Sequence, residues 1–290
     1  MGDKLKRIKL KDILSWAYEV LKSANVDSPR LSAELIISHA LNISRLELLL
    51  SLNNTIDLNL YTKIVSLINQ RALGKPVAYI IGKKEFYGRE FFVNQSVLIP
   101  RPETETLIDT VKNIFRKEDN FLFLDIGTGS GNIAITIGCE FPNSIGIATD
   151  YSIHALFVAY KNAKIYKLTN RLLFICTDIA RSIKEHSFDL VLSNPPYIGY
   201  KNFPSLSREI RCFEPYRALV GGYMGWEFYP SLISYSFKVL KKGGILIIEI
   251  DELVAKNVKK FLNNHKKWYN VQVIKDLSGK DRVLFAKRGE

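Results

Sequence analysis

The feature that most constrains the fold is a regular alternation of strand-like and helix-like segments from Phe121 onward. Short runs of β-branched and aromatic residues are separated by helix-forming segments such as 153–166 and 227–240. This pattern is typical of βαβ units and predicts an α/β fold with a doubly wound, mostly parallel sheet. The seven expected strands are residues 121–126, 145–148, 172–176, 188–193, 245–250, 271–274 and 282–286. The last two leave little room for a helix between them, which predicts an antiparallel hairpin at the sheet edge.

The first quarter of the chain has a different pattern. Apolar residues recur at helical spacing from Leu10 to Leu73, and Ser44 and Glu47 form a predicted capping box. From Ala78 to Ile99, β-branched and aromatic residues broken by glycines indicate a β-hairpin. A chain of 290 residues commonly forms two domains. We therefore expect a helical domain at 1–75, a hairpin and linker at 76–119, and an α/β domain at 120–290.

The composition indicates the cellular compartment of the protein and the kind of partner that it binds. Lys and Arg exceed Asp and Glu by 41 − 29 = +12, which suggests an acidic or nucleic-acid-rich partner surface, although a Lys-rich proteome has the same effect. The three cysteines lie far apart, so neither a zinc site nor a disulfide framework is expected, and a reducing compartment is favoured. No apolar run approaches membrane-spanning length. These observations predict a cytoplasmic protein without a metal site or membrane partner.

A glycine-rich loop follows the first expected strand, in the segment Asp125-Ile126-Gly127-Thr128-Gly129-Ser130-Gly131. Such a loop lets the backbone approach a ligand, and the following helix N-terminus attracts negative charge. The motif typical of a dinucleotide-binding fold is G-x-G-x-x-G. Here Asn132 occupies the position of its third glycine, which disfavours a nicotinamide oxidoreductase. Asp125 would repel a pyrophosphate, yet it could order the loop or face the ammonium of a methionine moiety.

Acidic residues at two further strand ends complete a predicted cofactor site. Asp150 follows the second strand, where a carboxylate would hold both ribose hydroxyls. Asp178 and Ile179 follow the third strand, where an adenine ring could dock, although Asp178 could equally cap a helix. Together with the glycine loop, Asp150 points to S-adenosyl-L-methionine as the cofactor.

The segment Asn194-Pro195-Pro196-Tyr197 follows the fourth expected strand and is suited to a planar nitrogen. An amide or ring-amino nitrogen is a weak nucleophile because its lone pair is delocalised. Asn194 offers a side-chain oxygen and Pro195 a carbonyl in a stiff segment, so together they could accept both N–H protons. Tyr197 could lay an aromatic face on the planar group. A simple strand-terminating turn is the alternative interpretation of these four residues.

Taken together, these motifs resemble the peptide chain release factor glutamine methyltransferases, and the resemblance covers almost the whole chain. Besides the glycine loop and Asn194–Tyr197, it rests on Gly74-Lys75-Pro76 with Tyr79-Ile80 and Glu85-Phe86, Leu98-Ile99-Pro100-Arg101-Pro102-Glu103-Thr104-Glu105, Glu214-Pro215-Tyr216-Arg217-Ala218-Leu219 with Gly221-Gly222, and Asp276-Leu277-Ser278-Gly279 with Arg282. The chain departs from the family pattern at Met224, where an acidic residue is common.

The resemblance implies a seven-stranded methyltransferase sheet and a protein-glutamine N-methyltransferase that uses S-adenosyl-L-methionine and releases S-adenosyl-L-homocysteine. It implies cofactor contacts from Gly127, Thr128, Gly129, Ser130, Gly131, Asp150, Ile179 and Asn194. It implies that Asn194, Pro195, Pro196 and Tyr197 bind the substrate amide, with Asn194, Pro195 and Tyr197 as the catalytic residues. The expected partner is a class-one peptide chain release factor, modified on the glutamine of Gly-Gly-Gln and gripped by the helical domain, which would modulate translation termination.

Three other functions stay open on the sequence. A DNA or RNA amino-methyltransferase would use the same four residues on a base, and the charge of +12 is compatible with it, although no aromatic and basic recognition domain is evident. A related family methylates a glutamine of a ribosomal protein. A non-enzymatic module that binds a translation factor would transfer no methyl group. We expect no direct nucleic-acid substrate.

Overall fold

The computed structural model describes residues 7–179 and 183–289, and the chain forms two compact units. The first contains the residues up to Gly82 together with Ser207–Phe213. The second contains Lys83–Leu206 and the residues from Glu214 onward. The predicted hairpin is thus grouped with the α/β residues, and the short segment at Ser207–Phe213 with the helical ones. Each unit is described by itself.

The first unit is a helical bundle around one apolar core that includes Ile13, Ile36 and Ile64. Its elements are β1 (Ile8–Lys9), α1 (Leu10–Ser23), α2 (Pro29–Leu41), α3 (Arg45–Leu50), β2 (Thr55–Ile56), α4 (Leu58–Ala72), α5 (Val77–Ile81) and α9 (Arg208–Phe213). The Ser44–Glu47 capping box begins α3 as predicted, with both reciprocal hydrogen bonds present. Thus local capping chemistry places the start of this helix.

The predicted hairpin starts later than expected, because Ala78–Ile81 lies within the helix α5 and not in a strand. Pro76 precedes this helix and Gly82 ends it in a left-handed conformation with φ of 74°. Tyr79 and Ile80 are buried, so tertiary packing outweighs the strand preference of this β-branched and aromatic run. The hairpin is confined to β3 (Lys83–Phe86) and β4 (Arg89–Phe92), which pair antiparallel.

The second unit is built on a seven-stranded sheet with the order β10-β11-β9-β8-β5-β6-β7. Its strands are β5 (Leu122–Ile126), β6 (Ile145–Asp150), β7 (Leu172–Cys176), β8 (Phe188–Ser193), β9 (Leu240–Glu249), β10 (Trp268–Lys275) and β11 (Asp281–Arg288). The five neighbouring strands β9, β8, β5, β6 and β7 are parallel. Strand β11 runs antiparallel to both β9 and β10. The predicted doubly wound, mostly parallel sheet with a late antiparallel hairpin is confirmed.

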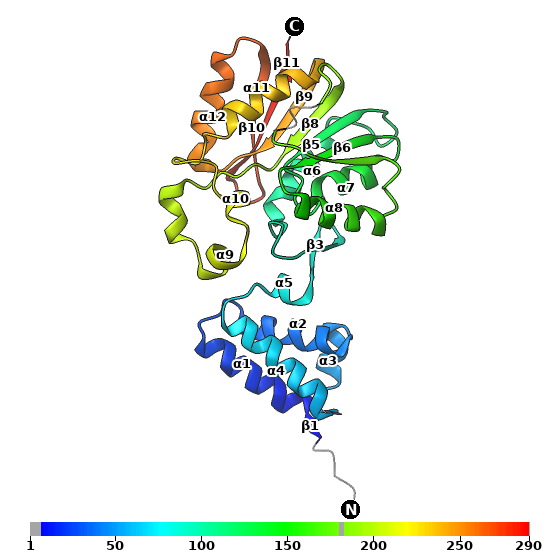
Figure 1. Cartoon of the computed structure of the whole chain (residues 1–290), viewed down its shortest axis with the longest axis vertical. Helices are drawn as coiled ribbons and strands as arrows, with labels where there is room; N and C mark the ends of the chain where they lie inside the picture. Colours follow the sequence, from blue (N-terminus) through cyan, green and yellow to red (C-terminus); the bar gives the residue numbers. More distant parts are fainter. Residues whose placement is uncertain (1–6, 180–182, 290) are drawn as a thin grey trace, which may run out of the picture. The chain divides into compact units, whose positions relative to one another are not determined.

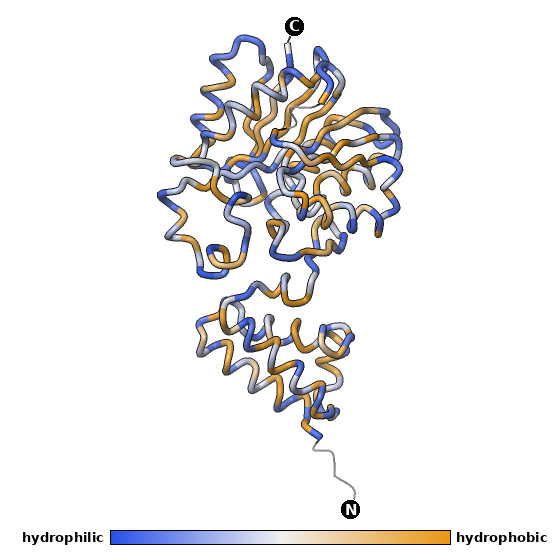
Figure 2. The backbone as a smooth tube through the Cα atoms, viewed as in Figure 1, coloured by the Kyte–Doolittle hydropathy of each residue, from blue (hydrophilic) through white to orange (hydrophobic). Residues whose placement is uncertain are grey.

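Helices cover both faces of this sheet (Figure 1). They are α6 (Glu105–Lys112), α7 (Asn132–Glu140) and α8 (Ile153–Ile165) on one face, and α11 (Tyr229–Val239) and α12 (Glu252–Asn264) on the other. Short helices η1 (Pro102–Thr104), η2 (Tyr200–Ser205) and α10 (Tyr216–Leu219) lie in the connections. Figure 2 shows the central strands as the most continuously apolar part of the unit, as expected for a sheet buried on both faces.

Alternate residues of each central strand supply the two cores. Phe123 and Leu190 face the core under α6 and α7, whereas Leu124 and Val191 face the core under α11 and α12. This packing leaves the carboxyl ends of the parallel strands as the place where loops can form a site. Within the described ranges, no helix is both long enough and apolar enough to cross a membrane.

Candidate active site

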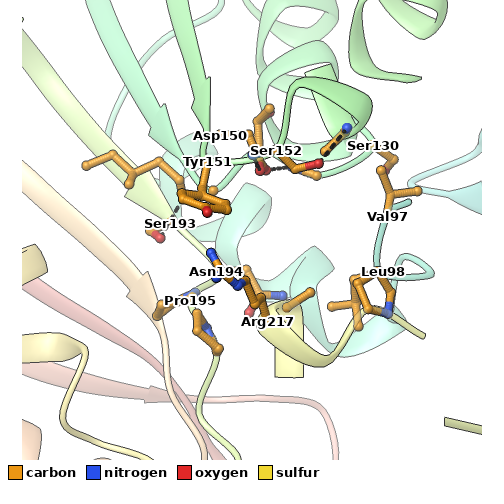
Figure 3. Close-up of a pocket in the computed structure, with 18 of the residues that line it drawn as sticks. Val97, Leu98, Ser130, Asp150, Tyr151, Ser152, Ser193, Asn194, Pro195 and Arg217 are labelled. Carbon is orange, nitrogen blue, oxygen red and sulfur yellow. Dashed lines mark hydrogen bonds between the residues drawn. The ribbon is translucent and has the colours of Figure 1, made fainter. Parts of the chain in front are cut away.

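A cavity of about 400 Å³ lies at the carboxyl ends of the parallel strands, entirely within the second unit. Segments from distant parts of the sequence form its wall. They include 96–104, the glycine loop after β5, the residues after β6, the residues after β7, and the residues around Asn194 and around Arg217. Figure 3 shows Asn194, Pro195 and Arg217 gathered together, away from Asp150, Ser152 and Ser130. The fold thus brings the predicted cofactor loop and the predicted substrate motif to one cavity.

The glycine loop provides an open backbone surface. Gly127, Thr128, Gly129 and Ser130 all line the cavity. No atom lies within 4 Å of the position that a Cβ would take at Gly129, whose φ is 54°. A ligand can therefore approach this backbone closely, as the glycine pattern predicted.

Gly131 has a packing role that the sequence did not predict. It is buried and is not among the residues that line the cavity. A Cβ at Gly131 would lie 2.8 Å from Cδ1 of Ile135 and 3.1 Å from Cβ of Ala159. Ala159 belongs to α8. The missing side chain therefore permits close packing of the start of α7 against α8, while a direct cofactor contact from Gly131 stays untested.

Asp125 is a buried residue that hydrogen-bonds to the glycine loop. Its side chain is fully buried, and Oδ2 accepts a hydrogen bond of 2.6 Å from the Thr128 hydroxyl. Burial raises the pKa of Asp125 to about 7, while the Thr128 hydrogen bond acts in the opposite direction. Because Asp125 does not line the cavity, of its two suggested roles its contacts favour the ordering of the loop.

Asp150 lies at the end of β6 with both carboxylate oxygens engaged. Oδ2 accepts from the backbone N–H of Gly129 at 2.9 Å, and Oδ1 accepts from that of Ser152 at 2.8 Å. Burial raises the pKa of Asp150, and these backbone donors oppose the rise. A carboxylate has about four acceptor positions, so Asp150 can still accept from a ligand diol. Its contacts also join the glycine loop to the start of α8.

Tyr151, which follows Asp150 in the sequence, and Arg217 are exposed side chains in contact with each other. The guanidinium of Arg217 lies over the ring of Tyr151, 4.4 Å from its centroid, in cation–π geometry. Both line the cavity, as do Asp178 and Ile179 after β7. The residues expected near an adenine ring therefore line the cavity, and Tyr151 and Arg217 add a stacked pair that the sequence did not predict.

Asn194 follows β8 and is half-buried at the cavity wall. Its Nδ2 donates to the hydroxyl of Thr104 at 3.1 Å. No second hydrogen bond of this side chain occurs within the part of the chain that the structure describes, so its oxygen Oδ1 is available as an acceptor. Pro195 and Pro196 line the cavity next to it. The free oxygen is compatible with the acceptor role predicted for Asn194, and the acceptor role of the Pro195 carbonyl stays a prediction.

Tyr197 does not line the cavity, although it was expected to stack on the substrate amide. Its ring packs with the core under α11 and α12, and its hydroxyl donates to Oε1 of Glu249 at 3.4 Å. Burial and the nearby Glu249 carboxylate raise the pKa of Tyr197 well above its ordinary value. Tyr197 therefore contacts the core and Glu249, and it does not form part of the cavity wall.

The segments around Arg101 and Glu214 carry part of the family resemblance, but the sequence predicted no role for either residue. In the structure, Arg101 donates to Oε1 of Glu214 at 2.5 Å, and the backbone N–H of Ile99 donates to Oε2 at 3.3 Å. The Glu214 side chain is 1% exposed and that of Arg101 is 28% exposed, so the carboxylate is shielded from water while the guanidinium is partly exposed. The pair connects two of the segments that form the cavity wall. The signal in the sequence that could have suggested it is the presence of two segments rich in proline and charged residues, one around Arg101 and one around Glu214.

Comparison with known proteins identifies the family. Residues 12–82 match the PrmC N-terminal domain, and residues 102–209 match the methyltransferase small domain. A release factor glutamine methyltransferase of Nitratidesulfovibrio vulgaris is 41% identical over 284 residues, which cover 96% of this chain and 95% of the relative. The chain belongs to the release factor glutamine methyltransferase family. Another member, from Aquifex aeolicus, is 34% identical over 286 residues, which cover 98% of each chain.

A solved structure agrees with the fold of this family member. A methyltransferase from Pyrococcus furiosus aligns with a TM-score of 0.53 at 21% identity, covering 77% of this chain and 99% of that one. At this identity the likeness supports the fold alone. As a member of the release factor glutamine methyltransferase family, the protein is an enzyme, and its cofactor is S-adenosyl-L-methionine.

The residues of the cavity fit this cofactor. The open backbone at Gly129 can take a methionine moiety, and Asp150 retains acceptor capacity for two ribose hydroxyls. The Tyr151 ring and Ile179 offer apolar surface for an adenine. The family assignment and the donor set of the cavity therefore agree.

Proposed function

We propose that this protein transfers a methyl group from S-adenosyl-L-methionine to the side-chain amide nitrogen of the glutamine in the Gly-Gly-Gln motif of class-one peptide chain release factors. The family membership supports the reaction type and the release factor as substrate. The observation that carries the proposal within the site is the hydrogen bond from Asn194 Nδ2 to Thr104, which leaves an amide oxygen for the substrate.

The chemistry needs orientation more than a strong base. Bound S-adenosyl-L-methionine supplies a methyl group on a positively charged sulfur, which becomes neutral S-adenosyl-L-homocysteine on transfer. Asn194 Oδ1 and the Pro195 carbonyl accept the two amide protons of glutamine and direct its lone pair toward the methyl group. As positive charge develops on nitrogen, both oxygens stabilise it, and one proton then leaves to water.

The cofactor contacts follow the same assignment. Gly127, Thr128, Gly129 and Ser130 would hold the methionine moiety, and Asp150 would accept from the ribose hydroxyls. Ile179 would pack on the adenine. Tyr197 would support the site from behind, since its hydroxyl is engaged with Glu249.

The helical domain would recognise the release factor outside the Gly-Gly-Gln loop. Residues 12–82 match a domain named for this family, which supports a dedicated role. An enzyme with this substrate would work in the cytoplasm, where termination takes place. If the helical domain contributes affinity, the KM for intact release factor should be far below that for a short Gly-Gly-Gln peptide.

The test is incubation of the enzyme with radiolabelled cofactor and three acceptors: intact release factor, the same factor with Gly-Gly-Glu, and an unmodified DNA duplex. Label is expected on the glutamine of the first acceptor alone. Glutamate presents no protons to Asn194 and Pro195, so its carboxylate would face two acceptor oxygens. Label in adenine of the DNA and none in the release factor would establish the nucleic-acid alternative instead.

A further inference from the structure

A fully buried amide side chain outside the cavity contacts two distant segments of the chain. Asn162 belongs to α8, is 0% exposed and does not line the cavity. Its Oδ1 accepts from the backbone N–H of Phe92 at 2.8 Å. Its Nδ2 donates to the carbonyl oxygens of Phe92 at 2.9 Å and of Ser130 at 2.8 Å. The oxygen and both amide protons are therefore engaged, which offsets the cost of burying an amide.

Two of these hydrogen bonds attach α8 to the hairpin. Asn162 binds both the N–H and the carbonyl of Phe92, as a neighbouring antiparallel strand would. The hydroxyl of Tyr166, just after α8, donates to the carbonyl of Glu90 at 2.7 Å. In addition, Nζ of Lys161 lies 3.3 Å from the centroid of the Phe92 ring. The end of β4 is thus fixed on α8.

The end of β4 leads directly into a wall of the cavity. After Phe92 the chain turns at Asn94, whose Oδ1 accepts from the N–H of Ser96 at 2.9 Å. The carbonyl of Asn94 accepts from the N–H of Val97 at 3.1 Å. Ser96, Val97 and Leu98 all line the cavity. A side chain that fixes Phe92 therefore also places the first residues of this wall.

The third hydrogen bond of Asn162 holds the glycine loop. It ends on the carbonyl of Ser130, and the N–H of the same peptide group belongs to Gly131 and donates to the Thr128 carbonyl at 2.8 Å. The peptide group between Ser130 and Gly131 is thus held at both ends. Without the Asn162 donor, a buried carbonyl would lose this partner, which favours rotation of the peptide group. Such a rotation displaces Thr128 and Ser130, which line the cavity.

We propose that Asn162 is a positioning residue for the cofactor, which holds the glycine loop and the wall at 96–98 in the arrangement that S-adenosyl-L-methionine requires. It acts through the backbone of Ser130 and Phe92. This inference rests on the cofactor role given to the glycine loop in the proposed function. A wall that is already ordered loses less freedom when the ligand binds, so loss of the link should weaken affinity more than it slows the chemical step.

The test compares Asn162→Asp and Asn162→Leu with the wild type. Aspartate keeps an acceptor for the Phe92 N–H but places a second oxygen against the carbonyls of Phe92 and Ser130, whereas leucine removes all three hydrogen bonds. The dissociation constant for S-adenosyl-L-homocysteine, measured by calorimetry, should rise about 10- to 100-fold in both variants. The KM for S-adenosyl-L-methionine should rise by a similar factor, while kcat at saturating cofactor should stay within about threefold of the wild-type value.

Arg171→Met is the matched control for a general loss of stability. Arg171 also joins distant backbone groups, because it donates to the carbonyls of Gly138 at 2.8 Å and of Ser144 at 2.9 Å. These three residues do not line the cavity. The variant should lower the thermal stability and leave the dissociation constant within about twofold. An equal loss of affinity in Arg171→Met and in the Asn162 variants would overturn the inference.

Amide hydrogen exchange of the wild type supplies a second measurement, which needs no variant to fold. If Asn162 couples the glycine loop to the hairpin, binding of S-adenosyl-L-homocysteine should slow the exchange of the Phe92 N–H by about 3- to 10-fold, although Phe92 does not line the cavity. The Asp276 N–H, which donates to the Lys280 carbonyl between β10 and β11, should exchange at an unchanged rate.

Wild-type affinity in a folded Asn162 variant would overturn the inference, as would a fall in kcat at saturating cofactor with an unchanged KM. Where neither variant folds, an unchanged exchange rate at Phe92 on ligand binding overturns it equally. Failure of the proposed function is distinct, because the wild type itself would then leave the Gly-Gly-Gln protein unmethylated or fail to bind S-adenosyl-L-homocysteine.

Discussion

Asp150 is the residue whose substitution should separate cofactor binding from catalysis. Asp150→Ala removes the acceptor proposed for the ribose hydroxyls, so cofactor binding should weaken by about 1.5–3 kcal/mol, the range for hydrogen bonds to a charged group. Isothermal calorimetry measures this directly. The variant also leaves the N–H groups of Gly129 and Ser152 without their acceptor, so thermal unfolding must accompany the titration. Unchanged affinity in a folded variant would exclude Asp150 from the cofactor site.

Asn194 should affect turnover more than binding. Its oxygen is proposed to strengthen its contact as positive charge develops on the substrate nitrogen. Asn194→Ala should therefore lower kcat by about 10²–10³, the size of effect seen when one preorganised polar partner of a developing charge is lost. Single-turnover kinetics at saturating cofactor measure the effect. A raised KM with an unaltered kcat would instead indicate that Asn194 only binds the substrate in its ground state.

At the scale of elements, α7 depends on Gly131 for its approach to α8. Gly131→Ala would place a methyl group against Ile135 and Ala159 at a residue with φ of 79°, so we expect a loss of about 2–4 kcal/mol in unfolding free energy. Gly129→Ala is the matched control. It has a positive φ but open space, so it should cost only about 1 kcal/mol. Urea unfolding compares the two. Equal losses would show that backbone conformation, and not helix packing, is what requires Gly131.

At the scale of the whole molecule, two buried carboxyl groups should make stability depend on pH. The pKa of Asp125 is raised from 3.8 to about 7, and that of Glu249 from 4.5 to about 7. Between these limits the folded state holds protons that the unfolded chain has released. Stability should therefore decrease, by up to a few kcal/mol, as the pH rises from about 4.5 to 7.

Chemical unfolding at several pH values and at high salt, which screens the net charge of +12, measures this dependence. Asp125→Asn and Glu249→Gln should each flatten the slope. Below about pH 4 the slope should reverse, because ion pairs lower the pKa values of Glu34 and Glu140. A stability that is constant between pH 5 and 7 would contradict the raised pKa values of the two buried groups.

The sequence by itself determined the features that depend on local pattern. The apolar runs located the central strands β5, β8 and β9, because strands buried on both faces are nearly continuously apolar. The Ser44–Glu47 capping box located the start of α3, since its hydrogen bonds join residues three positions apart. The glycine loop and Asn194 were identifiable because a backbone cradle and an amide acceptor need particular residue types at fixed spacing.

Tertiary structure decided what depends on residues far apart in the chain. Burial turned Ala78–Ile81 into part of a helix despite its strand-like composition, and it directed Tyr197 toward Glu249 instead of the cavity. Thr104 meets Asn194 across 90 positions, and Arg101 meets Glu214 across 113. No local periodicity encodes such pairs, because they form only when the sheet order brings β8, β9 and the 96–104 segment together.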